Sequence, residues 1–187
     1  MTEELAEFLS FYLPNEDIDP FLKLFKEQRI KKGRHLLKPG MDCNYLAFVQ
    51  QGIFRVYFLD AKDREVITWF SFDGMVITDM LGYYTTGKAQ FYVEALDNSL
   101  VYKLDKSDLE NLYQRQPAYS NFGRKFAEEA LTMLMQRTLS LHTKSAEERY
   151  TELLQIPDLI QKVPLKYLAT YLGITDTSLS RIRKKIR

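Results

Sequence analysis

Cysteine and histidine are scarce in this 187-residue chain, which contains one cysteine and two histidines. Cys43 by itself cannot form an intrachain disulfide, a CxxC pair or a four-cysteine metal or iron–sulfur site. We therefore expect it to be a small buried or half-buried side chain. His35 and His142 lie far apart in the sequence, and neither sits in the context of a catalytic triad or a metal-ligand cluster. We predict no metal site and no catalytic residues.

Long apolar runs are also missing. No stretch of about 18 uninterrupted apolar residues is present, which argues against a membrane span, and the N-terminus "MTEELAEFLS" is acidic, unlike a signal peptide. With 45% hydrophobic and 13% aromatic residues, the chain can still bury a substantial core. These features predict a soluble, cytoplasmic globular protein with no membrane partner.

Acidic residues are absent from the last seven positions. Residues 181–187 carry five of the 26 basic groups and none of the 25 acidic ones, so residues 1–180 sum to 21 − 25 = −4. A mildly acidic body with a concentrated basic end indicates a polyanionic partner that binds locally.

The first third of the chain changes from helical to β periodicity. Apolar stripes at Leu5, Phe8, Leu9 and Tyr12, and again around Phe21–Phe25, predict two short helices. Between residues 29 and 104 follow short β-like runs: "HLLKPG", "YLAFVQQG", "IFRVYFLD", "REVITWF", "VEAL" and "SLVYKL". Glycine-containing turns separate these runs at the spacing of a small all-β barrel or roll.

After Pro117 the pattern becomes helical, with an apolar seam in which steps of four and three residues alternate. The seam consists of Ala127, Leu131, Leu134, Thr138 and Leu141. Phe126 and Met133 lie on an adjacent stripe, so this helix can pack one stripe on its own β-domain and offer the other to a second copy. The alternative is one wide core-facing stripe in a monomer. Ser145 followed by Glu147 and Glu148 indicates a new helix cap, so we place a break near 143–145.

The C-terminal segment "LKYLATYLGITDTSLSRIRKK" has the pattern of a helix-turn-helix. Ala169 falls where two crossing helices leave no room for a larger side chain, and Gly173 falls where the turn needs a positive φ. Pro164 can begin the first helix, and Thr175 can cap the second. Apolar residues expected in the shared core are Leu168, Leu172, Ile174, Leu179 and Ile182.

The second helix can be phased at 100° per residue. If Leu179, Ile182 and Ile186 point inward, Thr177, Arg181 and Lys184 lie at the centre of the outward face, with Ser180 and Lys185 beside them. Arg181 is the best candidate for a base contact, because its guanidinium can grip guanine O6 and N7 together. We expect phosphate contacts from Lys166, Arg183, Lys184, Lys185 and Arg187. Thr175, Asp176 and Ser178 at the helix start complete the candidate DNA-binding set.

The sequence resembles the Crp/Fnr family of bacterial transcription regulators over nearly its whole length. The matching stretches are "LLKPG", "FVQQGIFRVYF", "VEALDNSLVYKL", "EERYTELL" and "YLATYLGITDTSLSRIRKKI". The resemblance implies an α+β chain with three parts. These are a β-roll of the cyclic-nucleotide-binding type (a double-stranded β-helix) over 1–116, a dimerisation helix over 117–144 and a helix-turn-helix over 145–187. It also implies that positions 176, 177 and 181 lie near base edges. The sequence ends directly after this helix, so we expect any following β-wing to be absent or truncated.

Members of the family that bind cyclic nucleotides carry a phosphate cassette resembling FGE followed by RxAS/T. In this chain the stretch "FSFDGMVITDMLGYYTTGKAQFYVEAL" contains no arginine. The arginine position falls on Ala89 and the hydroxyl position on Tyr92, so we expect no cyclic AMP binding of the usual kind. The residues expected to line an effector pocket or to plug it are Phe72, Met80, Tyr83, Tyr84, Phe91 and Tyr92.

The leading hypothesis is a homodimeric DNA-binding transcription regulator with double-stranded DNA, a second copy of itself and RNA polymerase as partners. No cofactor is predicted with certainty, although a small effector other than cyclic AMP is compatible with the roll. The alternatives are a cupin-type enzyme, which lacks the histidines it needs, and a small-molecule-binding roll whose basic end is incidental.

Overall fold

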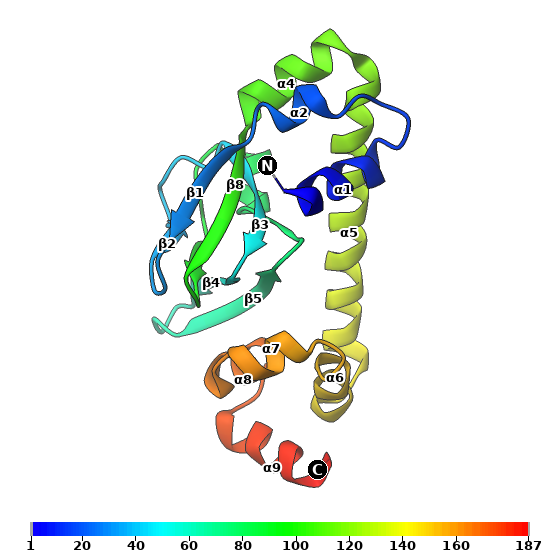
Figure 1. Ribbon diagram of the computed structural model, residues 1–187. Helices are drawn as coiled ribbons and strands as arrows, with labels where there is room; N and C mark the ends of the chain where they lie inside the picture. Colours follow the sequence, from blue (N-terminus) through cyan, green and yellow to red (C-terminus); the bar gives the residue numbers. More distant parts are fainter. Residues whose placement is uncertain (1, 187) are drawn as a thin grey trace. The chain divides into compact units, whose positions relative to one another are not determined.

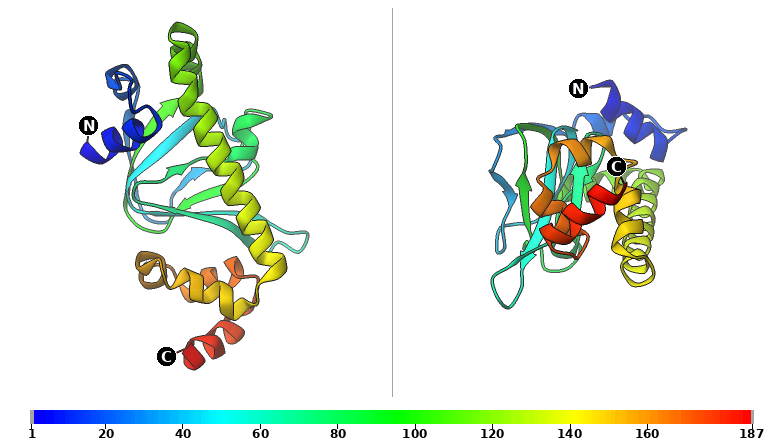
Figure 2. Two further views of the ribbon diagram at one scale, coloured as in Figure 1. Left: turned by 90° about the vertical axis from the view of Figure 1, so that its right-hand side faces the viewer. Right: turned by 90° about the horizontal axis from the view of Figure 1, so that it is seen from below.

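The computed structural model describes residues 2–186. By its internal contacts the chain divides into two compact units, which we describe separately. The first comprises the chain up to Phe58 together with Trp69–Glu128, and the second comprises Leu59–Thr68 and the chain from Glu129 onward. Figures 1 and 2 show the course of the chain through both.

The chain forms two four-stranded sheets that make up most of the first unit, and their paired strands run antiparallel (Figure 1). One sheet has the order β1-β8-β3-β6, with β1 at Lys26–Ile30, β8 at Ser99–Asp105, β3 at Tyr45–Gln51 and β6 at Val76–Ile77. The other has the order β2-β7-β4-β5, with β2 at His35–Leu37, β7 at Tyr92–Ala95, β4 at Ile53–Leu59 and β5 at Glu65–Phe72. The six predicted β-runs are all strands, which confirms the β-roll.

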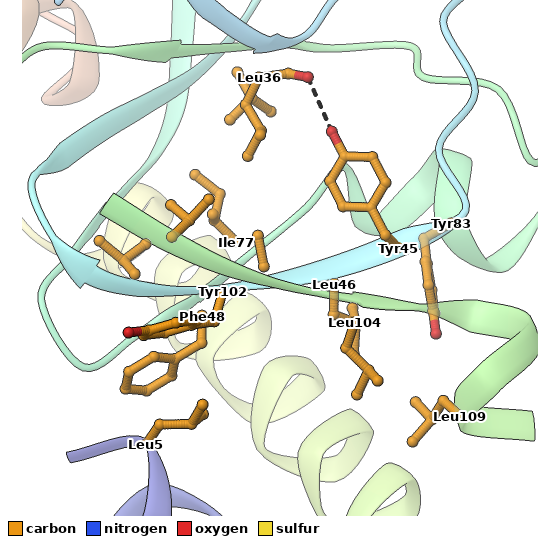
Figure 3. Packing of buried hydrophobic residues seen from close by; sticks show 14 of the residues in the cluster. Leu5, Leu36, Tyr45, Leu46, Phe48, Ile77, Tyr83, Tyr102, Leu104 and Leu109 are labelled. Atoms are coloured by element: carbon orange, nitrogen blue, oxygen red, sulfur yellow. Dashed lines mark hydrogen bonds between the residues drawn. The ribbon is translucent and has the colours of Figure 1, made fainter. Parts of the chain in front are cut away.

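One hydrophobic cluster joins both sheets. It takes Ala47 and Val49 from β3, and Val56 and Val93 from the opposite sheet, all of them buried. Figure 3 shows part of this packing, including the Tyr45 hydroxyl, which donates a hydrogen bond of 2.9 Å to the Leu36 carbonyl. Alternate residues of a strand face opposite sides, and here both sides are covered: Phe48, next to Val49, is also buried and packs against Phe8 near the N-terminus.

Short helices cover the roll. They are α1 (Glu3–Tyr12), α2 (Asp19–Leu22), α3 (Met80–Tyr84), α4 (Lys106–Arg115) and the 3-10 turn η1 (Pro117–Tyr119). The stripe predicted for the first helix is confirmed, because Leu5 and Leu9 are fully buried and Phe8 packs on the core. Phe25 lies beyond the second helix, which ends at Leu22.

The long helix α5 (Ser120–Thr143) begins in the first unit, beside α1. The ring centroids of Tyr12 and Phe122 lie 5.5 Å apart, and Phe126 stacks on Phe122 and packs against the roll's core. Of the predicted core-facing stripe, Phe126 therefore packs on the roll, whereas Met133 is 37% exposed and does not. Its end at Thr143 agrees with the predicted break.

The second unit continues with α6 (Ala146–Leu153), α7 (Pro157–Lys162), α8 (Leu165–Tyr171) and α9 (Asp176–Ile186). Ser145 caps α6 in a full capping box. Its hydroxyl accepts from the Glu148 backbone N–H, and the Glu148 carboxylate accepts from the Ser145 backbone N–H. The cap predicted at this position is confirmed.

Candidate nucleic-acid interface and sensor cassette

Helices α8 and α9 share a small apolar core. Leu168, Ala169, Leu172 and Leu179 are all buried, and Ala169 and Leu179 have no exposed surface. A side chain larger than alanine at position 169 would have to displace this packing, as the sequence pattern predicts. The two helices therefore form a packed pair.

The turn between them is a Schellman motif. Gly173 has a φ of +71°, the left-handed conformation that glycine adopts without a Cβ penalty. Its N–H donates to the Thr170 carbonyl at 3.0 Å, and the Ile174 N–H donates to the Ala169 carbonyl at 3.0 Å. These two bonds satisfy carbonyls that the end of α8 would otherwise leave open.

Thr175 caps the start of α9. Its hydroxyl oxygen accepts from the Ser178 backbone N–H at 3.2 Å and lies 3.0 Å from the Ser178 hydroxyl. The cap confirms the predicted role of Thr175 in starting the helix. It also means that both hydroxyls are already engaged at the helix start.

The outward face of α9 carries exposed Thr177, Arg181 and Lys184, which successive turns of the helix place on one side. Ser180 is half-buried beside them, and Asp176 is exposed at the first turn. Lys166 is exposed on the first turn of α8, with its ammonium 4.7 Å from the Tyr167 ring centroid. The structure thus gathers the three central residues of the predicted set on one basic face.

The inward face of α9 is shorter than predicted. Leu179 is buried and Ile182 half-buried, whereas Ile186, one turn beyond Ile182 on the same side of the helix, is 37% exposed. α8 has seven residues and α9 has eleven, so the partner helix covers only the first turns of α9. Arg183 is half-buried, and Arg187 lies outside the described residues.

Lys185 is not free for a phosphate in this conformation. Its ammonium lies 2.8 Å from a carboxylate oxygen of Glu147 on α6, although both side chains keep substantial solvent exposure. Such exposed ion pairs contribute little stability and exchange easily. Lys185 can therefore contact a polyanion only by exchanging this partner.

One side of α5 presents a row of exposed apolar side chains. Leu131 and Leu134 are 58% and 60% exposed, and Leu141 is exposed as well. Sequence analysis missed Met135 and Leu139, which are equally exposed and widen the row; their four-residue steps from Leu131 were the available signal. Ala127 is half-buried and Thr138 exposed on the same side.

The cassette between β6 and β7 is organised by Asp79, which sequence analysis did not identify. Asp79 is 1% exposed, and its carboxylate accepts hydrogen bonds from three backbone N–H groups, those of Gly82, Gln90 and Phe91. Converging backbone N–H groups of this kind form an anion-binding concavity. Here a carboxylate of the chain itself occupies it.

The cassette is tightly closed around this carboxylate. A Cβ at Gly82 would lie 2.4 Å from the Lys88 carbonyl oxygen, so only glycine fits there. Ala89, to which the sequence pattern assigns the arginine position, is buried, and its backbone N–H and carbonyl both pair with the 40–41 turn.

The six predicted pocket residues have different surroundings. Tyr83 is buried in the core cluster, where burial raises the pKa of its hydroxyl, and the Lys106 ammonium donates to its carbonyl at 2.9 Å. Tyr84 contacts Tyr83 edge-to-face but is half exposed. Phe91 packs edge-to-face on Phe58. Phe72 and Met80 are half-buried.

Tyr92 belongs to a polar cluster on the other face of its strand. Its ring stacks on Tyr57 at 4.8 Å, and the His35 imidazole lies 3.1 Å from the Tyr57 hydroxyl. On the same face the buried Arg55 donates through Nε and Nη2 to one carboxylate oxygen of Glu94, at 2.8 and 2.6 Å. Sequence analysis missed this pair, although an arginine within the apolar run "IFRVYF" was a signal.

Comparison with solved structures identifies the fold. FixK2 from Bradyrhizobium japonicum superimposes with a TM-score of 0.75 at 21% identity, covering 87% of this chain and 84% of that one. A CooA double mutant from Carboxydothermus hydrogenoformans superimposes with a TM-score of 0.69 at 24% identity, covering 96% of this chain and 83% of that one. A candidate transcriptional regulator of the Crp/Fnr family from Eubacterium rectale gives 0.69 at 18% identity, covering 100% and 83%. The chain therefore has the fold of Crp/Fnr transcription regulators.

A family model matches part of the chain. Residues 27–116 match the cyclic nucleotide-binding domain, a little under half of the chain. No curated protein gives a significant sequence match. No helix within residues 2–186 is both long and apolar enough to span a bilayer. The same residues contain no group of three or more His, Cys, Asp or Glu side chains placed to hold a metal ion.

Proposed function

We propose that this chain is a sequence-specific DNA-binding transcription regulator that acts as a homodimer in the cytoplasm, with RNA polymerase as a further partner. The observation that carries the proposal is the α8–Gly173–α9 unit. Its apolar core holds α9 so that Thr177, Arg181 and Lys184 are exposed together. A helix that presents donors and positive charge on one face fits the major groove.

The exposed apolar row of α5 supports the dimer. Exposed leucines and methionines in such a continuous row are unfavourable on a solvated helix but favourable as a seam between two helices. Two copies related by a twofold axis would present two α9 helices, which matches half-sites about 34 Å apart on a pseudo-palindromic operator. Selection of bound duplexes from random DNA tests the proposal, and a protein that enriches no sequence would contradict it.

Arg181→Ala and Lys184→Ala are expected to have different effects on DNA binding. Loss of the Arg181 fork should reduce discrimination between the selected operator and a single-base variant by about 1–3 kcal/mol. Loss of Lys184 should weaken binding to operator and random DNA alike and reduce the salt slope by about one. Fluorescence anisotropy at several salt concentrations measures both, and equal losses on all DNA for both variants would contradict this division.

Cyclic AMP is expected not to bind the roll. Residues 70–96 contain no arginine, so a buried cyclic phosphate there would lack the guanidinium of the family pattern, and an uncompensated buried charge costs several kcal/mol. Isothermal titration calorimetry should therefore show no binding tighter than about 1 mM. A family member that carries the cassette arginine serves as the positive control, and micromolar binding to this chain would refute the expectation.

A further inference from the structure

The carbonyl groups at the end of α8 show an unusual set of partners. The last four carbonyls of a helix have no partner within it. At α8 the Schellman motif satisfies those of Ala169 and Thr170. The next two accept from arginine side chains: Tyr171 from Arg137 Nη2, and Leu172 from Arg149 Nη2 at 2.8 Å. Two guanidinium groups therefore complete the end of this helix.

Arg137 makes a second contact with the same residue. Its guanidinium carbon lies 3.7 Å from the centroid of the Tyr171 ring, so the side chain stacks on the ring while donating to the backbone. Burial lowers the pKa of Arg137; Tyr171 opposes this shift, and the charge of Arg149 adds to it. A planar guanidinium can stack on the ring and donate to the carbonyl at once, whereas a lysine ammonium cannot.

Both arginines tie α8 to α5. Arg137 is itself a residue of α5, and Arg149 on α6 also donates through Nη1 to the carbonyl of Lys144, the residue that follows α5. α8 is in turn fixed to α9 by the Gly173 turn and the buried Leu179. The direction of α9 is thus tied to the helix that carries the apolar row.

We propose that Arg137 is a positioning residue that holds α9 at a fixed angle to α5, so that it sets the half-site spacing the dimer accepts. This inference rests on the proposed function. Arg137 need not touch DNA for this role, because it acts through the end of α8. Without the Arg137 side chain, the distance and angle between the α9 helices of the two copies should vary more. The contacts that each α9 makes with its own half-site should not change.

The test measures spacing preference separately from base preference. Each base pair added between half-sites rotates the second one by about 34° and moves it by about 3.4 Å. Using the operator selected by the wild-type protein, we expect one added or removed base pair to cost that protein at least about tenfold in affinity. For Arg137→Gln we expect the same change in spacing to lower the affinity less than about threefold. A base change within a half-site should lower the affinity of both proteins equally.

Matched variants control the experiment. Arg124→Gln removes an exposed α5 arginine that pairs with Glu128 at 2.7 Å, and it should keep the wild-type spacing profile. Tyr171→Phe retains both the ring and the backbone carbonyl, so it should also behave as wild type. Should Arg137→Gln fail to fold, Arg137→Lys retains charge and one donor, and its spacing profile should be intermediate.

The outcomes separate this inference from the proposed function. A selected operator whose spacing profile is the same for wild type and Arg137→Gln, or for wild type and Arg137→Lys, would overturn only the inference. A weakened spacing preference in Arg124→Gln as well would also overturn the inference, because the effect would then not depend on the contact with α8. A wild-type protein that enriches no DNA would overturn both.

Discussion

Leu134→Asp is expected to convert the protein from a dimer to a monomer. Leu134 is 60% exposed at the middle of the apolar row of α5, and twofold symmetry would bring two copies of it into the seam. The variant would bury two carboxylates in an apolar interface and place like charges close together. We expect the dissociation constant to rise at least about a hundredfold, which corresponds to about 1.4 kcal/mol for each copy. Sedimentation equilibrium at micromolar concentration measures it.

Leu81→Asp is the matched control for this prediction. Leu81 lies on α3 and is nearly as exposed as Leu134, but it is not part of the row on α5. We expect Leu81→Asp to remain dimeric and to bind the operator as wild type does. A wild-type protein that is monomeric at micromolar concentration, or a Leu134→Asp variant that stays dimeric, would contradict the proposed interface.

Asp79→Ala is expected to lower the free energy of unfolding of the roll by about 3 kcal/mol. The variant leaves the backbone N–H groups of Gly82, Gln90 and Phe91 without their acceptor in a buried site. Asp79→Asn should lower the free energy of unfolding less, because its amide oxygen can still accept a hydrogen bond. Urea unfolding followed by the fluorescence of Trp69, the only tryptophan and a residue packed against the core, reports on this unit.

Asp73→Ala controls for the loss of an aspartate as such. Asp73 accepts a single backbone hydrogen bond, from the Gly52 N–H at 2.7 Å, in an exposed turn. Its loss should cost no more than about 1 kcal/mol. Equal destabilisation by the two alanine variants would show that the buried carboxylate has no special role in holding the cassette.

The strands that sequence analysis found and the ones it missed differ in a simple way. The six predicted runs are rich in β-branched, aromatic and other apolar residues that enter the shared core. β1, "KEQRI", is almost entirely exposed and has no apolar alternation. It is a strand because its backbone pairs with β8 along its whole length. Such pairing is a tertiary property and leaves little trace in the segment itself.

The candidate sites also divide into residues set by local sequence and residues set by tertiary contacts. Ala169, Gly173 and Thr175 were identified from the sequence, because a helix-turn-helix places local steric and capping demands at fixed offsets. Asp79, Arg55 and Arg137 were not. Asp79 caps α3 locally through the Gly82 N–H, but its other partners, Gln90 and Phe91, lie in a different segment. Arg55 meets Glu94 only across a strand pair, and Arg137 meets Tyr171 only once α5 and α8 are packed.

The sequence alone therefore determined the order of elements, the apolar seam of the long helix and the basic outward face of the last one. Each of these follows from periodicity and near-neighbour chemistry, which act over a few residues. Only the tertiary structure showed that a carboxylate of the chain fills the cassette and that an arginine of α5 holds the end of α8. Apart from the local cap on Gly82, both depend on hydrogen bonds between different segments of the chain, and only the packing of the folded chain brings those donors and acceptors together.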